Sequence, residues 1–567
     1  MNWLDYTLII IYLIAFIGMG YFFKENKTSK DYFLGGKSLG WFPLSLSTMA
    51  TQLSAISFIS APAFVGLKKG GGMKWLTFEF GVPLAMIGIM FFIIPPLYKS
   101  GIVSIYEYLE KRFSSSTRKL ISVVFQISRA LGTGVMVFTM ALIIQAVVGI
   151  SFHLTLLIIS VVTLIYSYQG GMKAVVWGDA IQMIILFLGL IICLVVGYSM
   201  LQDVGPFQGF NPERLQVIDI SNLGIYSGEE YGFFPMLLGG LFLYLSYYGT
   251  DQTQAQRLLS ARDSTSIKKL LVANGLLRFP VVFVYSVMGL IIGYLVSNIP
   301  DFYESIVATT KAHYPAEYAR NGIKPDLMIP VFITKYLPNG LIGILMIGIM
   351  SAAMSSLSST INSLSAVTIE DFFNNKHAMS EKRYMFVSKA LVLFWGTVCI
   401  LAAYLFGNSQ STVIELINSI SSLFYGPILA AFVIAIFFKK VNHIGMNVAI
   451  ITSVSINLIF KYLPEIVYAF NEGHFYSGSE NIHTALANIN IHHIPDLFWI
   501  WYNLTGFVIA VVFAILASKL TKHIPVKKVG VAYSINFRTI LTLETGILFT
   551  FFIAILIFSL LIPSIFS

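Results

Sequence analysis

The sequence predicts an all-α integral membrane protein, and three observations support this fold class. Hydrophobic residues make up 56% of the 567 residues and charged residues only 11%, whereas about 25% of residues are charged in soluble domains. Apolar runs recur that are long enough to cross a hydrocarbon core of about 30 Å, which takes about 20 helical residues. Helix is also the form in which one segment satisfies its own backbone hydrogen bonds in lipid.

Fourteen apolar segments are long enough to be spans. We expect them at 4–23, 41–67, 75–98, 119–149, 151–168, 175–201, 232–252, 267–297, 338–370, 385–406, 411–438, 441–462, 495–518 and 540–563. The first span is predicted to stay as a helix rather than be removed as a signal peptide, because MNWLDYT ahead of it contains Asp5 and no Lys or Arg. We expect a single transmembrane domain over 1–567, with no soluble module.

Most of the 36 Lys and Arg residues lie in the connections that follow odd-numbered spans. The positive-inside rule places those connections in the cytoplasm and both termini outside it, as in a multi-pass protein of the plasma (inner) membrane. The net charge of +9 is therefore a topology signal. We expect the lipid bilayer and a small solute as partners, no nucleic acid, and no obligate protein partner.

Residues 354–363, MSSLSSTINS, place six hydroxyl side chains in a span that is otherwise apolar. One helix face carries residues spaced at i, i+3, i+4 and i+7, namely Ala352, Ser355, Ser356 and Ser359. Small residues also mark close helix contacts in membranes, but six hydroxyls exceed what packing requires. Hydroxyls, together with carbonyls freed where a helix is broken, supply the oxygen ligands that a sodium ion needs.

Two other spans carry the signals of a broken helix. The second span runs through a series of polar residues from Thr48 to Ser60 and then meets Pro62. In the seventh span, Gly249 and Asp251 stand where the apolar run ends. Broken helices near the bilayer midplane are where transporters build their ion and substrate sites.

Charged residues inside spans are costly and therefore informative. Asp179 needs a cation partner, and the serine-rich span could hold that cation. Arg129 and Glu79 have two open roles: a buried ion pair with each other, or contacts to a substrate. No nucleophile with a base and no cluster with metal-ligand spacing is evident, so the chain is not predicted to be an enzyme.

From about residue 5 to 440 the chain resembles the sodium/solute symporter family, which includes sugar, sialic acid, proline, monocarboxylate and vitamin transporters. The matching stretches are DYFLGGKSLGWF, MATQLSAISF, YEYLEKRF, YSYQGGMKAVVWGDAIQ, GTDQTQAQRLLSA and MSSLSSTINSLSAVTIEDF. The resemblance implies a LeuT-like fold with two inverted five-helix repeats and alternating access. The first repeat lies within 41–252, the second begins with 232–252 and continues through 267–297 and 338–438, and 441–567 adds peripheral helices.

The resemblance also implies two sodium sites and two coupling ions. The first site would use the carbonyls of Ala50, Leu53 and Ala352 with the hydroxyls of Ser355 and Ser356. The second would join Asp179 to the hydroxyls of Ser355, Ser358 and Ser359.

For the substrate, the resemblance favours a carboxylated solute, such as a sugar acid like sialic acid, or another organic anion. Arg129 aligns with an arginine that pairs with the substrate carboxylate in the sialic acid branch, a role that suits a planar guanidinium. Glu79 and Gln52 depart from that branch, and a Glu near Glu79 bonds sugar hydroxyls in sugar-transporting relatives.

The predicted substrate-binding residues are Gln52, Ser54, Ser57, Trp75, Glu79, Arg129 and Tyr248, with Trp75 and Tyr248 as gates. The alternative solute is a neutral hexose or polyol. The alternative of another class is a passive channel or a non-transporting sensor.

Overall fold

The computed structural model describes residues 1–24, 28–53, 55–204, 209–221, 223–225, 231–315, 318–319, 322–373, 379–404, 412–472, 497–522 and 540–566. Within these ranges the regular secondary structure is helical, apart from one isolated bridge between Leu39 and Ala261. Eleven of the described helices are long and apolar enough to cross a membrane, or up to twelve if one bent pair counts as a single span. The predicted all-helical membrane fold is therefore confirmed.

Ten of the labelled helices in the described ranges are long: α1 (Trp3–Phe22), α9 (Ser115–Val148), α10 (Phe152–Asp203), α14 (Ser264–Asn298), α18 (Leu341–Thr368), α19 (Glu381–Ala403), α20 (Val413–Phe437), α21 (His443–Glu472), α23 (Tyr502–Leu520) and α24 (Leu543–Phe566). The eleventh long helix, Met73–Lys99, is made up of several shorter labelled segments. The shorter ones are α2 (Ser29–Leu34), α3 (Trp41–Gln52), α4 (Ala55–Gly66), α5 (Leu76–Glu79), α6 (Gly81–Gly88), α7 (Ile94–Lys99), α8 (Glu107–Arg112), α11 (Pro212–Leu215), α12 (Gly240–Gly249), α13 (Gln252–Leu259), α15 (Pro300–His313) and α17 (Met328–Tyr336). Single 3-10 or π turns are η1 (Gly35–Lys37), η2 (Met73–Trp75), η3 (Ile89–Ile93), η4 (Pro235–Gly239), η5 (Pro325–Leu327), η6 (Ile369–Phe373) and η7 (Trp499–Trp501).

The fourteen predicted spans fall on these helices, but the structure groups them differently. α10 joins the fifth and sixth predicted spans in 52 residues, which at 1.5 Å per residue is far longer than one crossing requires. The seventh predicted span corresponds to η4 and α12, which form one continuous helix that ends at Gly249 and is too short to cross alone, and α13 begins only at the last residue of the span, Gln252. The number of long apolar helices is therefore lower than the number of spans predicted from hydropathy.

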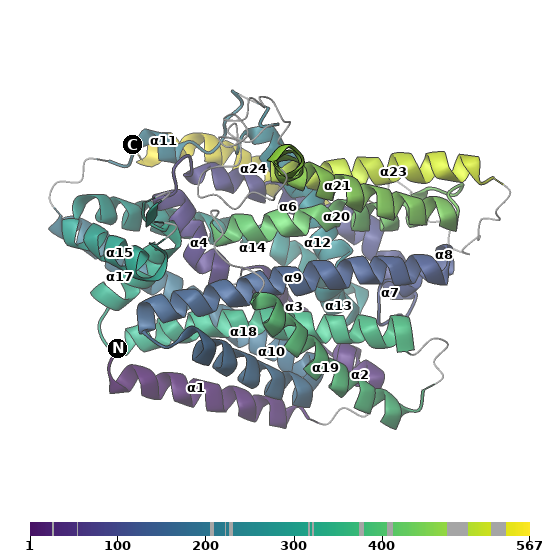
Figure 1. The fold of residues 1–567 in the computed structure, drawn as a ribbon, viewed down its shortest axis with the longest axis horizontal. Helices are drawn as coiled ribbons and strands as arrows, with labels where there is room; N and C mark the ends of the chain where they lie inside the picture. Colours follow the sequence, from purple (N-terminus) through teal and green to yellow (C-terminus); the bar gives the residue numbers. More distant parts are fainter. Residues whose placement is uncertain are drawn as a thin grey trace.

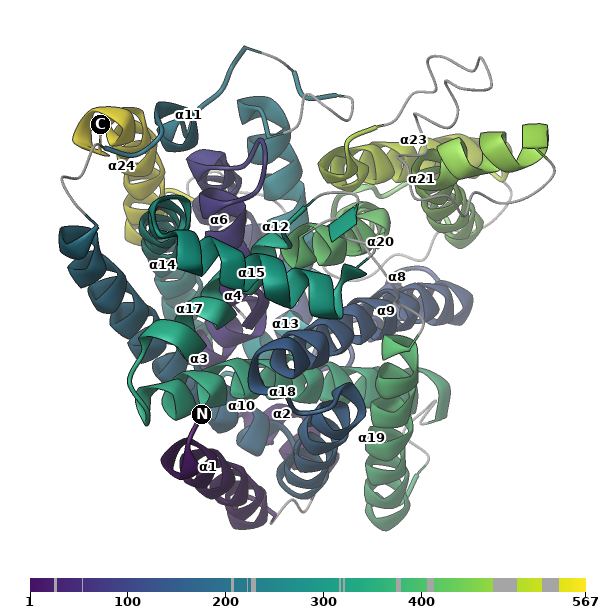
Figure 2. The ribbon, with the colours of Figure 1, turned by 60° about the vertical axis from the view of Figure 1, so that its left-hand side comes forward.

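The long helices run roughly side by side, with α9 and α18 between α1 on one side and α21 and α23 on the other (Figure 1). α18 packs against α10, α9, α19 and α1, and most of its residues are buried, as are those of α20. α1, α19 and α24 lie at the periphery, as Figure 2 also shows, and fewer than a third of the residues in their apolar windows are buried. The serine-rich helix is thus enclosed by protein, whereas the outer helices have apolar faces suited to lipid.

Both predicted breaks are present. α3 and α4 meet at a bend of 52°, and α3 ends where Leu53 leaves the helical conformation with ψ 66°. α12 ends at Gly249 and α13 begins at Gln252, with Asp251 as the N-cap. Each break exposes backbone groups that a continuous helix would have satisfied internally.

Asp5 fastens α1 to the start of α18. Its carboxylate is fully buried and accepts hydrogen bonds from the backbone N–H groups of Gly340 (2.7 Å) and Gly343 (2.8 Å). These N–H groups lie at the N-terminus of α18, where no intrahelical carbonyl is available and negative charge is favoured. Asp5 is therefore a structural cap on the N-terminus of α18.

Gly171 divides α10 into its two parts. Its backbone has φ 55° and ψ −148°, a region that is essentially restricted to glycine. A Cβ atom there would lie 2.5 Å from the carbonyl oxygen of Tyr32. The Tyr32 hydroxyl in turn donates to the carbonyls of Ser167 (3.2 Å) and Tyr168 (3.3 Å), which precede the break.

Replacing Gly171 by Ala is expected to destabilise the protein, because backbone strain of about 1–3 kcal/mol adds to the clash with Tyr32. The thermal midpoint of the detergent-purified variant should fall by several degrees. Gly18→Ala is the matched control, since a Cβ at Gly18 meets nothing within 4 Å and Ala is the better helix former. An unchanged midpoint in Gly171→Ala would contradict the role given to this break.

Candidate functional site

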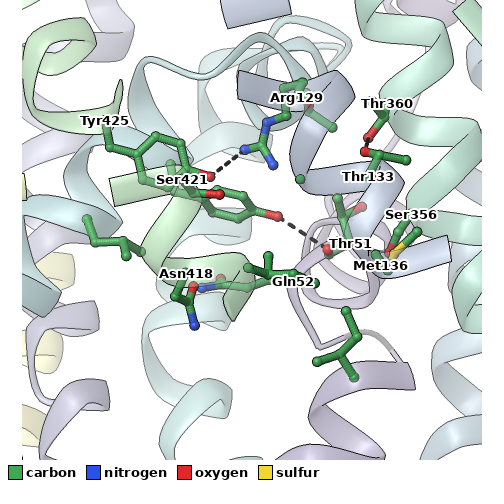
Figure 3. Close-up of a pocket in the computed structure, with 16 residues that line it drawn as sticks. Thr51, Gln52, Arg129, Thr133, Met136, Ser356, Thr360, Asn418, Ser421 and Tyr425 are labelled. Carbon is green, nitrogen blue, oxygen red and sulfur yellow. Dashed lines mark hydrogen bonds between the residues drawn. The ribbon is translucent and has the colours of Figure 1, made fainter. Parts of the chain in front are cut away.

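A cavity of about 680 Å³ lies where both broken helices meet α9, α18 and α20 (Figure 3). Its polar lining is contributed by five segments, through Thr51, Gln52, Arg129, Thr133, Tyr247, Thr253, Ser356, Thr360, Asn418, Ser421 and Tyr425. Ile56, Met136, Leu243 and Ile417 add apolar surface. A cavity at the centre of a membrane-spanning bundle with polar and apolar walls in similar proportion is suited to a small solute that carries polar groups.

Arg129 is the cationic group of this cavity. Its Nε donates to Oδ2 of Asp251 at 2.6 Å, and its Nη2 donates to the hydroxyl of Tyr425 at 2.8 Å. The guanidinium carbon also lies 4.9 Å from the centre of the Tyr247 ring, a cation–π distance. Arg129 is thus held by the break between α12 and α13 on one side and by α20 on the other.

Glu79 does not pair with Arg129, the partner that was considered for it from the sequence. Arg278 on α14 pairs with it through two hydrogen bonds, Nε to Oε2 at 2.8 Å and Nη2 to Oε1 at 3.2 Å. The hydroxyl of Tyr244 donates to Oε2 at 2.9 Å. The possible ion pair between Arg129 and Glu79 is therefore wrong, because each charge is already compensated by a residue from the second half of the core.

A second cavity, of about 430 Å³, adjoins the first. It is lined by Ser57, Trp75, Phe78, Glu79, Tyr244, Arg278 and Ile414, and it shares Gln52, Ile56, Ile417 and Asn418 with the cavity of Arg129. The predicted substrate residues that line a cavity therefore fall into two groups, one for each cavity. The two cavities adjoin at Gln52 and Asn418. The Gln52 side-chain oxygen is buried and has no hydrogen-bond partner among the described residues, so it is available to a ligand.

One predicted substrate residue within the described part of the chain, Tyr248, lines neither cavity. Tyr248 is buried behind the cavity walls, with its ring 5.4 Å from that of Tyr247 and 6.1 Å from that of Tyr244, centre to centre. Its hydroxyl has no partner within the described part of the chain. Ser54 lies outside the described residues, so its predicted role stays a prediction.

The residues predicted for the first sodium site fall on two elements in contact. Ala50 and Leu53 lie at the end of α3, and Ala352, Ser355 and Ser356 lie on the face of α18 that packs near it. The hydroxyl oxygen of Ser356 is buried without a partner among the described residues, on the wall of the cavity of Arg129. Such an orphaned oxygen beside a helix break fits a cation ligand better than a packing residue.

Asp179 on α10 is the centre of the predicted second sodium site. The hydroxyls of Ser355 and Ser359 donate to its two carboxylate oxygens, and Ser47 on α3 donates to Oδ2 at 2.6 Å. Ser358 does not reach it, because the Ser358 hydroxyl donates to the carbonyl of Ser355 at 2.9 Å. The serine stripe therefore does turn toward Asp179, through two of the three predicted hydroxyls.

The cation partner of Asp179 in this structure is Arg257 on α13. Its Nη2 lies 2.7 Å from Oδ2 of Asp179, and both side chains are 1% exposed. Its Nε also donates to the Ser47 hydroxyl at 2.7 Å. Sequence reasoning assigned this role to a sodium ion alone, although Arg257 stands six residues after Asp251 in the GTDQTQAQR stretch.

Several cavity residues were not singled out from the sequence. Thr133 follows Arg129 at i+4 on the same face of α9, and it donates a hydrogen bond to Thr360 at 3.0 Å. Asn418, Ser421 and Tyr425 recur at i, i+3 and i+7 on α20, a polar stripe that follows the same periodicity as the serine helix. Both patterns are visible in the sequence and would have predicted these walls.

Comparisons with known proteins agree with this architecture. Residues 32–453 match the family model "Sodium:solute symporter family". The sodium-coupled monocarboxylate transporter 2 of Bos taurus is 29% identical over 465 residues, which cover 79% of this chain and 71% of that protein. The sodium/glucose cotransporter 1 of Oryctolagus cuniculus is 27% identical over 557 residues, covering 92% of this chain and 80% of that one.

A solved structure shares the fold. The substrate-bound outward-open state of a Na+-coupled sialic acid symporter superposes with a TM-score of 0.71 at 22% identity, covering 93% of this chain and 100% of that chain. This likeness establishes the LeuT-like fold. Since the family model matches well over half of the sequence, the chain belongs to the sodium:solute symporter family, and it is a multi-pass membrane protein that couples solute transport to sodium.

Proposed function

We propose that the protein imports a small carboxylated solute, a sugar acid such as sialic acid or another organic anion, together with sodium by alternating access. The observation that carries this proposal is the position of Arg129 on the wall of the central cavity, with Nη1 donating to no group among the described residues. A guanidinium with free N–H groups is a suitable ligand for a carboxylate. Gln52 and Asn418 would bind polar groups on the remainder of the solute.

Two sodium ions are proposed for each cycle. At the first site, the unpartnered Ser356 hydroxyl and the freed carbonyls at the end of α3 support ion binding. At the second, the Ser355 hydroxyl donates a hydrogen bond to Oδ1 of Asp179 and keeps its lone pairs for a cation, whereas the Ser359 oxygen also accepts a hydrogen bond from Nη2 of Arg257. An ion there would share Asp179 with Arg257.

The proposed location is the plasma (inner) membrane, with both termini outside the cytoplasm. The excess of Lys and Arg in the connections after odd-numbered spans supports this orientation. The N- and C-termini also lie toward the same end of the molecule, near α15 (Figure 1). An even number of membrane crossings, such as the fourteen predicted spans, also places both termini on the same side of the membrane.

A neutral hexose or polyol is a second candidate, which one observation favours. Asp251 compensates the charge of Arg129, and the other polar walls consist of amides and hydroxyls. A passive channel or a sensor is disfavoured by the family to which the chain belongs. A thermal-shift screen of sugars, sugar acids and short carboxylates, with and without sodium, separates the two solute classes.

Replacing Arg129 by Gln should reduce sodium-driven uptake of the carboxylated solute into proteoliposomes. The expected loss in kcat/KM is roughly tenfold to hundredfold, since hydrogen bonds to charged groups contribute about 1.5–3 kcal/mol. Arg262→Gln is the control, because Arg262 is exposed and pairs with its neighbour Asp263. If Arg129→Gln folds and transports every tested carboxylate as the wild type does, the anionic part of the proposal is wrong.

Replacing Ser356 by Ala should weaken sodium binding whatever the solute. Loss of one oxygen ligand is expected to raise the half-saturating sodium concentration roughly tenfold, because a polar contact to a charged group contributes about 1.5–3 kcal/mol. The control is Ser365→Ala on the same helix, where the hydroxyl donates only to the carbonyl of Ile361 at 2.7 Å. Equal sodium dependence in the two variants would remove Ser356 from the site.

If a second sodium ion binds, loss of one of its ligands should change the cooperativity of sodium-dependent uptake. Ser359→Ala should lower the Hill coefficient for sodium from near two toward one, as measured by initial uptake rates over a sodium titration. Ser47→Ala is a sharp control, because Ser47 contacts Asp179 and Arg257 but is not a predicted ion ligand. A steepness that is unaltered in Ser359→Ala, or lost equally in both variants, argues against this ion.

A further inference from the structure

We propose that Asp251 is an internal counter-ion that sets which charge class of solute the cavity of Arg129 accepts. The inference deepens the proposed function, because it concerns the same cavity and the same arginine. It assigns Asp251 a role in specificity that is separate from solute contact. Its carboxylate competes with a solute anion for the guanidinium of Arg129, and it is always present because it is part of the protein.

The contacts of Arg129 define the competition. Asp251 occupies the Nε edge of the guanidinium, with Nε and Nη2 both directed at Oδ2 (2.6 and 2.5 Å). Tyr425 accepts from Nη2 as well. A solute anion is therefore left with Nη1 and a shared Nη2, and it meets a guanidinium whose charge is already compensated.

Asp251 cannot easily withdraw from this pair. Its other carboxylate oxygen, Oδ1, accepts from the backbone N–H of Thr253 at 2.8 Å and so caps α13. The side chain is 2% exposed. Movement away from Arg129 would remove the cap from a helix that begins inside the membrane, where unsatisfied N–H groups are costly.

Neither of the two buried arginines nearby lines the cavity of Arg129, although Arg278 lines the adjoining cavity and its Nη1 has no partner among the described residues. Arg257 is paired with Asp179 and Arg278 with Glu79, each within 2.8 Å. Arg129 is the more accessible member of its pair, with a side chain 15% exposed. Removal of the Asp251 charge would therefore create an uncompensated cation that faces the solute cavity.

The test uses the full-length purified protein and nitrate as a small anion probe. Asp251→Asn keeps the shape of the side chain and the capping oxygen, since Asn caps helices about as well as Asp. At constant total sodium, exchanging a bulky sulfonate for nitrate should raise the thermal midpoint of this variant by roughly 2 °C or more, as expected for anion binding to the folded state. The wild type should not respond.

Asp263→Asn is the matched control, because Asp263 is also an N-cap beside an arginine, Ser266 N–H donating to it at 2.7 Å, but it lies at the surface. The double variant Asp251→Asn with Arg129→Gln should lose the nitrate response. Asp251→Ser, which keeps a capping oxygen, is the second single variant if Asp251→Asn does not fold. A nitrate response no larger than that of the control, in whichever single variant folds, overturns the proposal.

The transport assay separates this inference from the proposed function. If the wild type carries a carboxylated solute, Asp251→Asn should lower its KM by about tenfold. If it carries a neutral solute, the carboxylate proposal fails, yet nitrate should still stabilise the variant and inhibit its uptake. If both single variants fail to fold while the double variant folds, the pair is structural only and the inference is overturned.

Discussion

The cost of burying charge in a membrane governs the centre of this structure. Two buried arginines and one partly buried arginine in the described part of this region are each paired with one carboxylate: Arg257 with Asp179, Arg278 with Glu79, and the partly buried Arg129 with Asp251. An unpaired ion in such surroundings is strongly destabilising, and the removal of one partner typically costs about 3–5 kcal/mol. The pairs therefore fix which helices lie together around the cavity.

Two of the pairs connect the break between α12 and α13 to a long helix, and the third joins two long helices, because α5 is part of the continuous helix Met73–Lys99. Arg129 on α9 holds the gap between α12 and α13, and Arg257 on α13 holds α10. Arg278 on α14 holds α5. The α13 side of the break is thus anchored twice, by Asp251 at the N-cap and by Arg257 within the helix. Backbone groups left free by the break are positioned by side-chain charges from neighbouring helices rather than by their own helix.

Hydropathy and local composition predicted the spans and both breaks, because these depend on neighbours in the sequence. Pro62 and Gly249 mark the broken helices, and the serine stripe of α18 follows from a spacing of three and four residues. The pairing of charges could not be predicted in the same way. Three carboxylates and three arginines allow several pairings, and only the packing of α9, α10, α13 and α14 selects one.

The serine helix and the helix breaks bring the solute cavity and the predicted sodium ligands onto shared residues. Ser356 lines the cavity and is a predicted ion ligand, and Gln52 stands next to Leu53 at the end of α3. A ligand at either place contacts both α3 and α18, so each would stabilise the same arrangement of the two helices. When ligands at two sites stabilise the same arrangement of one structural element, each ligand changes the affinity of the other site by the same factor. If both ligands bind as proposed, the break at Leu53 is such an element, because the proposed carbonyl ligand of Leu53 and the adjacent Gln52 side chain belong to one short stretch of backbone.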